Sequence, residues 1–397
     1  MKVANPPIDA PETIWEFALY GEIPAVQDLL KTNGDINSVN DHDNSLLHAA
    51  VLNKKIDRLK LVKFLVENKS DVNLVNRSRR TTICEAALEG HIEFPETTTA
   101  SSTTWQKTVP IRTQGNLEIV KILLDNNCGV NVKNRVGDGR IHNAAFKGHI
   151  AVVEHLADGN IRRSNDNGLT PLHLVAQNGH LDVVRFFVAK NVNIDVLSQD
   201  LVSPVFLAAQ NGHFEVVKFL VERGASVDTA DDQGDTPVIA AASEEHFGIV
   251  KYLVEKNVDV NSVNKRGLTT LAHVVARNNI SMTKFLMEKG ALVNEIVIEV
   301  SILNKNVELV KLILTTRNQT WGIFCFRFDP NSRNENGLSP LHVASTSGCL
   351  LLVEFLIKNG ADFNSTTPEG VTALHRASTN GHLDVVKALV TNGAECT

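Results

Sequence analysis

Cysteines, aromatic residues and long hydrophobic runs are all scarce in this chain of 397 residues. The five cysteines are odd in number, irregularly spaced and contain no C-x-x-C pair, which argues against a disulfide framework or a zinc module and favours a reducing compartment. Aromatic residues make up only 5% of the chain, so few side chains could stack on nucleic-acid bases. The net charge of −6 gives no electrostatic reason to expect nucleic acid either, and we predict no nucleic-acid partner.

Signals for membranes and export are also missing from the sequence. No stretch of 18 apolar residues occurs, and the most apolar short segment, Val297–Leu303, contains Glu299. The first eleven residues lack the apolar core of a signal peptide. We therefore expect a soluble, cytoplasmic and monomeric protein that does not insert into a membrane.

The main feature of the sequence is a motif that recurs about every 33 residues. It reads TPLHLVAQNGHLDVV from Thr170, with close copies from Ser339 and Thr372. A fixed period of this length indicates a stack of small units, none of which can bury its apolar face alone. With the histidine of T-P-L-H as the anchor, eleven units can be counted and six keep the histidine. The predicted anchors are Trp15, His48, Cys84, His142, His173, Phe206, Ile239, His273, Glu299, His342 and His375.

Each unit repeats the same local signals. Thr-Pro predicts the start of a first helix, because Thr suits the N-cap and Pro the first turn. Asn178-Gly179 predicts its end, with Gly in the left-handed conformation, and a second apolar helix follows. A Gly-Ala turn, an extended Val-Asn piece and a polar tip such as residues 231–234 then lead to the next Thr-Pro.

These motifs, T-P-L-H, N-G-H, G-A-D and V-N at this period, resemble the ankyrin repeat from about Glu12 onward. The resemblance implies an all-α-type repeat solenoid, in which helix–turn–helix–hairpin units stack in a curved array. It implies a concave side made of hairpins and first helices, and histidines that hydrogen-bond the backbone of neighbouring units. It also implies a non-enzymatic function in protein–protein interaction.

Departures from the period predict the division of the chain. Residues 1–11 form an N-terminal tail, 12–314 hold repeats one to nine, 315–328 are an aromatic insertion, and 329–397 hold repeats ten and eleven with an uncapped C-terminus. Within repeat three, residues 94–117 are predicted to be an inserted polar loop, because their composition cannot build a core. This loop is either a binding loop anchored by Trp105 or a tolerated insertion. The aromatic insertion either covers its neighbours or is exposed to a partner.

The step from His273 to Glu299 is only 26 residues long. Asn294 runs directly into an apolar helix-like segment, which leaves no room for a hairpin tip. We expect the row of hairpins to be interrupted between repeats eight and nine.

Charge follows the predicted tips. Basic residues gather in the tips that enter repeats three to five, and acidic residues gather in the tip that enters repeat seven. The basic group contains Arg77, Arg79, Arg80, Lys133, Arg135, Arg140, Arg162 and Arg163, and the acidic group contains Asp228, Asp231, Asp232 and Asp235. One hypothesis is a bipolar concave face that steers an acidic ligand onto the N-terminal half. The alternative is solvated charge without a partner.

No catalytic motif emerges. The sequence contains no G-x-x-x-x-G-K-[ST], G-x-G-x-x-G, H-E-x-x-H or G-x-S-x-G pattern, and histidines at equivalent positions of a solenoid lie too far apart to share one metal. We predict no cofactor, no metal site and no enzymatic activity. The favoured function is a scaffold or adaptor for partner proteins. The alternative is the ankyrin portion of a larger protein, such as a channel, a ubiquitin-ligase adaptor or a latrotoxin-like toxin, whose effector domain is absent.

Overall fold

The computed structural model describes residues 14–20, 23–32, 34–53, 58–89, 117–129, 132–157, 161–315 and 329–395. The chain divides into two compact units, Met1–Ala225 and Ser226–Thr397. The predicted tail 1–11, Trp105, residues 94–116 of the predicted loop, and the aromatic segment 316–328 lie outside the described residues.

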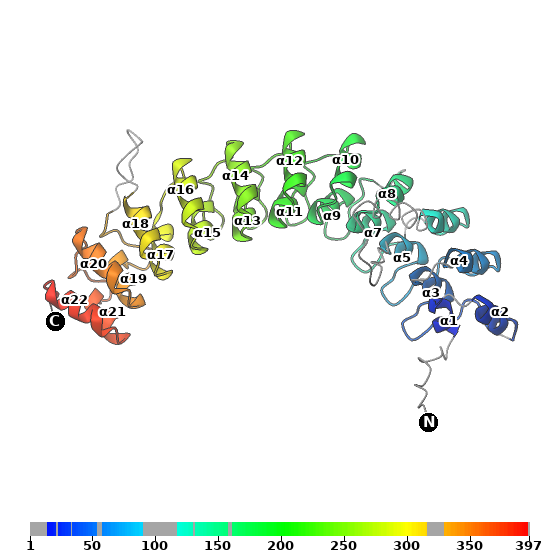
Figure 1. Ribbon diagram of the computed structural model, residues 1–397, viewed down its shortest axis with the longest axis horizontal. Helices are drawn as coiled ribbons and strands as arrows, with labels where there is room; N and C mark the ends of the chain where they lie inside the picture. The colour runs from blue at the N-terminus through cyan, green and yellow to red at the C-terminus, as the bar shows by residue number, and fades with distance from the viewer. Residues whose placement is uncertain are drawn as a thin grey trace, which may run out of the picture. The chain divides into compact units, whose positions relative to one another are not determined.

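The described residues form a succession of short helix pairs, six in the first unit and five in the second (Figure 1). The helices of the first unit are α1 (Ile14–Tyr20), α2 (Ile23–Lys31), α3 (Leu46–Leu52), α4 (Arg58–Glu67), α5 (Thr82–Leu88), the helix 117–125, α7 (Arg140–Lys147), α8 (Ile150–Leu156), α9 (Pro171–Gln177), α10 (Leu181–Ala189), α11 (Pro204–Gln210) and α12 (Phe214–Glu222). Those of the second unit are α13 (Pro237–Ser243), α14 (Phe247–Glu255), α15 (Thr270–Ala276), α16 (Ile280–Glu288), α17 (Glu295–Leu303), α18 (Val307–Thr315), α19 (Pro340–Ser347), α20 (Leu350–Lys358), α21 (Ala373–Thr379) and α22 (Leu383–Thr391).

The first helices of successive repeats pack against one another, as α7, α9 and α11 do in the first unit and α15, α17 and α19 do in the second. Second helices such as α8, α10 and α12 form the other layer. The predicted apolar positions make the core: Leu172, Val175 and Ala176 of α9 are fully buried, as are Val184 and Phe187 of α10. The prediction of an all-α repeat solenoid is confirmed.

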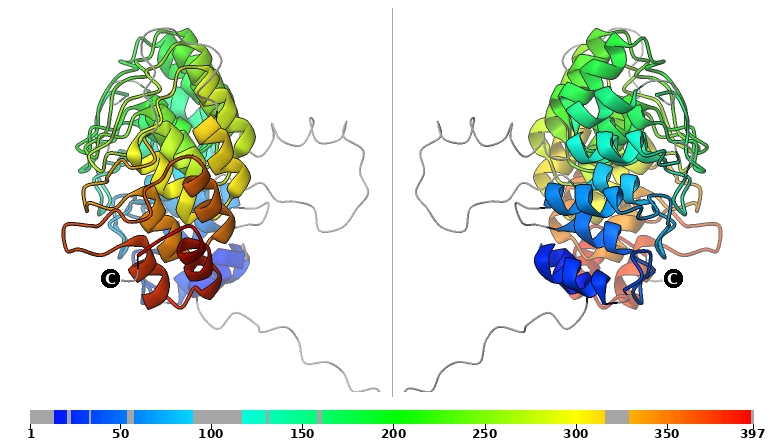
Figure 2. Two further views of the ribbon diagram at one scale, coloured as in Figure 1. Left: turned by 90° about the vertical axis from the view of Figure 1, so that its left-hand side faces the viewer. Right: turned by 90° about the vertical axis from the view of Figure 1, so that its right-hand side faces the viewer.

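Hairpins connect most consecutive repeats and project from one side of the helices within each unit (Figure 2). Each such hairpin is termed a finger and is named by its five-residue tip. The fingers with a described tip are 40–44, 76–80, 134–138, 165–169, 198–202, 231–235, 264–268, 334–338 and 367–371. In four of them an antiparallel bridge joins the two legs, for example Val39 with Ser45 and Val263 with Thr269. The fingers are therefore ordered extensions of the helix stack.

The histidines of the T-P-L-H motif bind each repeat to the next one. The Thr170 backbone N–H donates to Nδ1 of His173 at 3.0 Å, so the ring proton sits on Nε2, which donates to the Val202 carbonyl of the following finger at 3.1 Å. His48 and His342 reach the carbonyls of Arg80 and Val371 in the same way, at 3.1 and 3.0 Å. The contacts that the family resemblance implies are thus present.

The histidines of the N-G-H motif bind in the opposite direction along the chain. Nε2 of His213 lies 2.8 Å from the Gln177 carbonyl of the preceding repeat, and Nε2 of His180 lies 3.0 Å from the Phe146 carbonyl. Gly179 has φ of +75°, and a Cβ added there would lie 2.4 Å from the His213 ring. This glycine therefore serves two purposes, because it ends the first helix and leaves room for the histidine of the next repeat.

The anchor predicted at His273 is wrong by one residue. The N-cap of α15 is Thr269, whose hydroxyl accepts from the Ala272 N–H at 3.2 Å, so Ala272 holds the anchor position. Glu299 is displaced as well, because Asn294 caps α17 and Val297 occupies the equivalent position. Because Thr269 and Thr270 are adjacent, either could be taken as the N-cap, and choosing Thr270 placed the anchor at His273.

Asparagine at the first position of a tip builds the finger. Asn165 is buried; its Oδ1 accepts from the N–H groups of Asn167 and Leu169, both at 3.0 Å, and its Nδ2 donates to Asp138 of the preceding finger at 2.7 Å. Asn264 repeats this pattern with Asp235, at 2.8 Å. One amide thus closes its own hairpin and joins it to the neighbour.

Repeat nine has no finger, in agreement with the short step in the sequence. Only residues 289–294 connect α16 to α17. In repeat eight, two different residues do the work that falls to one residue in repeat nine. Asn261 hydrogen-bonds to the Gly290 carbonyl and the Leu292 N–H of the following turn, and Thr269 caps α15. Asn294 is the equivalent of Asn261 in repeat nine, but it is also the N-cap of α17. Repeat nine therefore lacks the segment that runs from Asn261 to Thr269 in repeat eight, and this segment contains the finger.

Acid should destabilise the fold through the neutral histidines. Burial lowers the pKa of His173 from 6.5 to about 4. Between these values the unfolded chain binds a proton that the folded chain does not, so stability is full above pH 6.5 and is lost as pH falls toward 4, by about 3 kcal/mol for this residue. We expect His173→Gln to remove that part of the acid loss in urea unfolding measured at pH 7.5 and 4. His155→Gln on α8, which is exposed, is the control. An unaltered acid loss in His173→Gln would contradict the assignment.

Asn165 and Asn167 allow a matched test of the finger. We expect Asn165→Ala to lower the free energy of unfolding by about 2–3 kcal/mol, because two N–H groups and the Asp138 carboxylate lose their partner. Asn167→Ala removes an exposed side chain from the same tip and should cost less than about 0.5 kcal/mol. Urea unfolding followed by circular dichroism measures both, and equal losses would refute the role given to Asn165.

Candidate protein-binding surface

Six of the seven predicted arginines lie in or next to the fingers of the first unit. Arg77, Arg79 and Arg80 belong to finger 76–80, and Arg135 belongs to finger 134–138. Arg162 lies in the turn, and Arg163 in the short segment, that precede finger 165–169, and both are exposed. The fold therefore gathers onto one row of hairpins residues that are up to 86 positions apart in the sequence.

Several of these arginines hold the fingers together. Arg77 donates to the Asp41 carbonyl at 2.6 Å and lies 3.8 Å from the Asp43 carboxylate. Arg135 donates to the Arg77 carbonyl at 2.5 Å, and Arg162 donates to the Asn191 carbonyl at 3.0 Å. These guanidinium groups already have partners, so their replacement would disturb the fingers as well as the surface charge.

Arg79 and Arg80 differ in their availability. Arg79 is exposed and has φ of +58°; its backbone N–H donates to the Asn76 carbonyl at 2.8 Å, but its side chain makes no hydrogen bond or ion pair within the described residues. Arg80 lies 3.7 Å from the buried Glu85 carboxylate, and its own side chain is 34% exposed. Arg79 is therefore the arginine of this finger that is best placed to meet a partner.

Arg140 is not part of a tip, contrary to the prediction. It is the first residue of α7 and is only 9% exposed. Burial lowers the pKa of its guanidinium group. Because the residue is buried in the helix layer, a partner on the fingers would not reach it.

Exposed apolar side chains accompany the basic residues, and sequence reasoning missed them. Val39, Val75 and Leu197 each precede the first tip residue, and Val136 and Leu201 lie within tips. All five are between 40% and 47% exposed.

Together with Arg77, Arg79, Arg135 and Arg162 they are termed the finger surface. The available signal was the recurring apolar residue before the tip, as in Val39-Asn40 and Val75-Asn76. An interface needs such apolar area at its centre, with charge around it.

The acidic tip of the second unit serves a structural purpose first. Asp231 occupies the position of the finger asparagine, and its Oδ1 accepts from the N–H groups of Gln233 and Asp235, at 2.9 and 2.8 Å. Desolvation by burial raises the pKa of Asp231. Asp235 accepts from Asn264 at 2.8 Å. Asp232 is exposed and makes no hydrogen bond or ion pair among the described residues.

Among the residues that the structure describes, no group of three or more His, Cys, Asp or Glu side chains could hold a metal ion. The described helices include none with the length and apolar character needed to cross a bilayer.

Comparison with known proteins gives the same fold. The family "Ankyrin repeats (3 copies)" matches residues 111–200, 187–264, 205–297 and 296–397, and the family "Ankyrin repeat" matches residues 42–77. These matches cover most of the chain, including the repeat without a finger.

Two curated proteins illustrate the similarity. The chain is 41% identical over 83 residues to the Notch-regulated ankyrin repeat-containing protein of Xenopus tropicalis, covering 19% of this chain and 73% of that protein. It is 25% identical over 195 residues to alpha-latrocrustotoxin-Lt1a of Latrodectus tredecimguttatus, covering 35% of this chain and 8% of the toxin. From its repeats, its histidine contacts and these matches, the chain belongs to the ankyrin-repeat family.

Proposed function

We propose that the chain is a non-enzymatic scaffold or adaptor that holds a partner protein segment on the finger surface of its first unit. Ankyrin repeats form protein-interaction modules and are generally not enzymes. The observation that carries the proposal is the presence, on the same fingers, of exposed apolar residues and of arginines whose guanidinium groups donate to backbone carbonyls of neighbouring fingers. The apolar residues are Val39, Val75, Val136, Leu197 and Leu201. A surface that is ordered before binding loses little conformational entropy when a partner arrives.

The charge of this surface favours an acidic segment. Arg79 is exposed, and Arg77 and Arg135 keep their guanidinium groups at the surface while bonding to backbone carbonyls. Positive side chains of this kind accelerate association with an acidic partner, and salt weakens the effect. The acidic tip 231–235 belongs to the second unit and is not part of this surface, and its Asp231 and Asp235 are engaged within their own fingers.

A second candidate function is that of a repeat segment within a larger protein. The alignment with alpha-latrocrustotoxin-Lt1a covers only 8% of that protein's length, so repeats like these occur there as part of a much longer chain. An antibody against the repeats should then detect a native protein well above the 43.4 kDa of this sequence. A single native band at that mass would remove this candidate.

The finger surface can be tested with two matched double variants. Val75→Ser with Arg79→Ser removes one apolar and one basic side chain from finger 76–80. Leu29→Ser with Lys63→Ser removes the same two types from the exposed faces of α2 and α4. After crosslinking in native lysate, we expect the first variant to lose the partner that the wild type captures. The association rate of that partner at low salt should fall about tenfold.

The second variant should behave as the wild type does. Circular dichroism confirms that both variants are folded. If both capture the wild-type partners at wild-type rates, the finger surface is not the binding site and the proposal fails.

A further inference from the structure

In four pairs of neighbouring fingers an equivalent backbone hydrogen bond joins one finger to the next. The residue after the first tip residue donates its N–H to a carbonyl of the preceding finger. In the first unit Asp166 donates to Val136 and Gln199 to Asn167, both at 3.1 Å. In the second unit Lys265 donates to Gln233 at 2.9 Å. In these pairs the earlier finger supplies an acceptor and the later finger a donor, whereas the Arg135 N–H makes no such bond among the described residues and Pro368 of finger 367–371 has no N–H to donate.

The missing finger of repeat nine leaves this series incomplete. By position, the Arg266 carbonyl is the acceptor that a finger of repeat nine would use, and the Glu335 N–H is the donor that it would receive. Neither group makes a hydrogen bond within the described residues. Both belong to exposed residues of the second unit.

A cleft of about 600 Å³ occupies the place of the missing finger. Finger 264–268 lines one side, finger 334–338 lines the other, and the segment from Leu292 to Glu299 at the start of α17 completes the lining. Leu292 is 57% exposed, and Ile296 is half-buried. The cleft is therefore large enough for a short stretch of chain and has an apolar contribution from α17.

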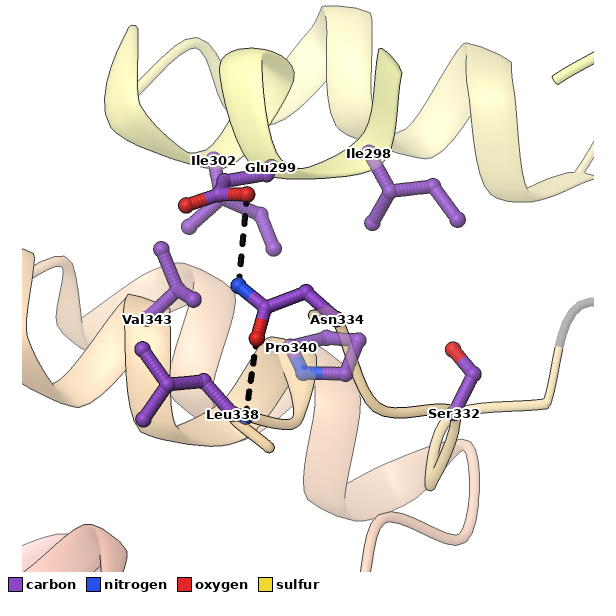
Figure 3. Close-up of a pocket in the computed structure, with 8 residues that line it drawn as sticks. All are labelled: Ile298, Glu299, Ile302, Ser332, Asn334, Leu338, Pro340 and Val343. Atoms are coloured by element: carbon purple, nitrogen blue, oxygen red, sulfur yellow. Dashed lines mark hydrogen bonds between the residues drawn. The ribbon is translucent and has the colours of Figure 1, made fainter. Parts of the chain in front are cut away.

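The side chain of Asn334 has found another partner in place of the missing finger. Asn334 would donate to an aspartate of the preceding finger, as Asn264 donates to Asp235. It donates instead to Oε2 of Glu299 at 3.3 Å, while its Oδ1 accepts from the Leu338 N–H at 2.9 Å (Figure 3). The carboxylate of Glu299 thus takes the place of the aspartate of a preceding finger. The backbone groups have no such substitute among the described residues.

The two sides of the cleft carry opposite charges. Lys265 and Arg266 are exposed on one side and form no ion pair among the described residues. Glu335 is exposed on the other side, and Glu299 lies below it in the lining. A segment that crosses the cleft would therefore meet a positive rim and a negative rim.

We propose that an extended segment of another protein fills this cleft and takes the place of the missing finger. A carbonyl of the segment accepts from the Glu335 N–H, and an N–H of the segment donates to the Arg266 carbonyl. An acidic side chain faces Lys265 and Arg266, a basic one faces Glu335, and a small apolar one rests on Leu292 and Ile296. Recognition is strand addition to the edge of a row of hairpins. This site is independent of the finger surface of the first unit.

A variant with a restored finger provides the sharpest control. In it, the repeat-eight residues 262–269 are duplicated between Asn294 and Glu295, which gives repeat nine a finger of its own. A phage-displayed library of random linear peptides is selected on the full chain and counter-selected on this variant. We expect enriched peptides with an acidic residue, whose affinity for the restored variant is at least tenfold lower.

Charge reversal and hydrogen exchange then locate the binding site. Lys265→Glu with Arg266→Glu should weaken the selected peptides at least tenfold. Lys251→Glu with Lys284→Glu, on α14 and α16, makes the same charge change elsewhere and should leave binding unchanged. Bound peptide should slow amide exchange in residues 333–338. The double variant V75S/R79S should bind the peptides normally, which separates this site from the finger surface.

Three outcomes would overturn the proposal. One is a selection in which no peptide distinguishes the full chain from the restored variant. Another is peptide binding that appears only when residues 316–328 are replaced by a Gly-Ser linker, since that would assign the cleft to this chain's own segment. The last is concentration-dependent dimerisation in ultracentrifugation that the restored finger abolishes, since that would assign the cleft to a second copy.

Discussion

The hydrogen bond from a buried histidine to a carbonyl of the next repeat is the interaction on which the structure depends. His173 accepts from its own helix cap through Nδ1 and donates to Val202 through Nε2. Neither repeat could satisfy both groups alone, because the carbonyl belongs to a finger that packs only when the preceding helix pair is in place. Buried polar groups must be paired, so a repeat that carries this histidine, as those of His48, His142, His173 and His342 do, requires its neighbour. A stack of nearest neighbours follows from that requirement, and the apolar core fills the space between them.

The same requirement decides which surface groups are available to a partner. The fingers carry many charged side chains, but Arg77, Arg135 and Asp231 bond to backbone groups and keep the row of hairpins ordered. Arg79 and the exposed valines and leucines of the finger surface remain. A preformed row of hairpins can then bind through a few side chains, because its backbone is ordered before the partner arrives. Stability and recognition use neighbouring residues of one finger for different purposes.

The periodic parts of the chain could be predicted from sequence because each motif has one local physical meaning. Thr170-Pro171 starts α9, Asn178-Gly179 ends it, and His173 pairs as the family pattern implies. Prediction failed where two residues of one type compete for a position, as Thr269 and Thr270 do, and the anchor moved from Ala272 to His273. It also failed for Arg140 and for the exposed apolar residues, because composition does not tell whether a side chain faces the helix layer or the solvent. That information comes from packing between repeats.

Repeat nine shows how the stack tolerates the loss of a finger. The hydrogen bonds of a finger fall into two groups, those of the tip asparagine and those between backbones. Glu299 replaces the first group, because a carboxylate on α17 can reach the amide of Asn334. A side chain cannot so easily replace the second group, which needs a donor and an acceptor at the spacing of an extended chain. The loss of one hairpin therefore costs the fold little while leaving an edge that another extended chain can complete. In a repeat protein, a missing element can thus create a binding site whose geometry is inherited from the repeats on either side.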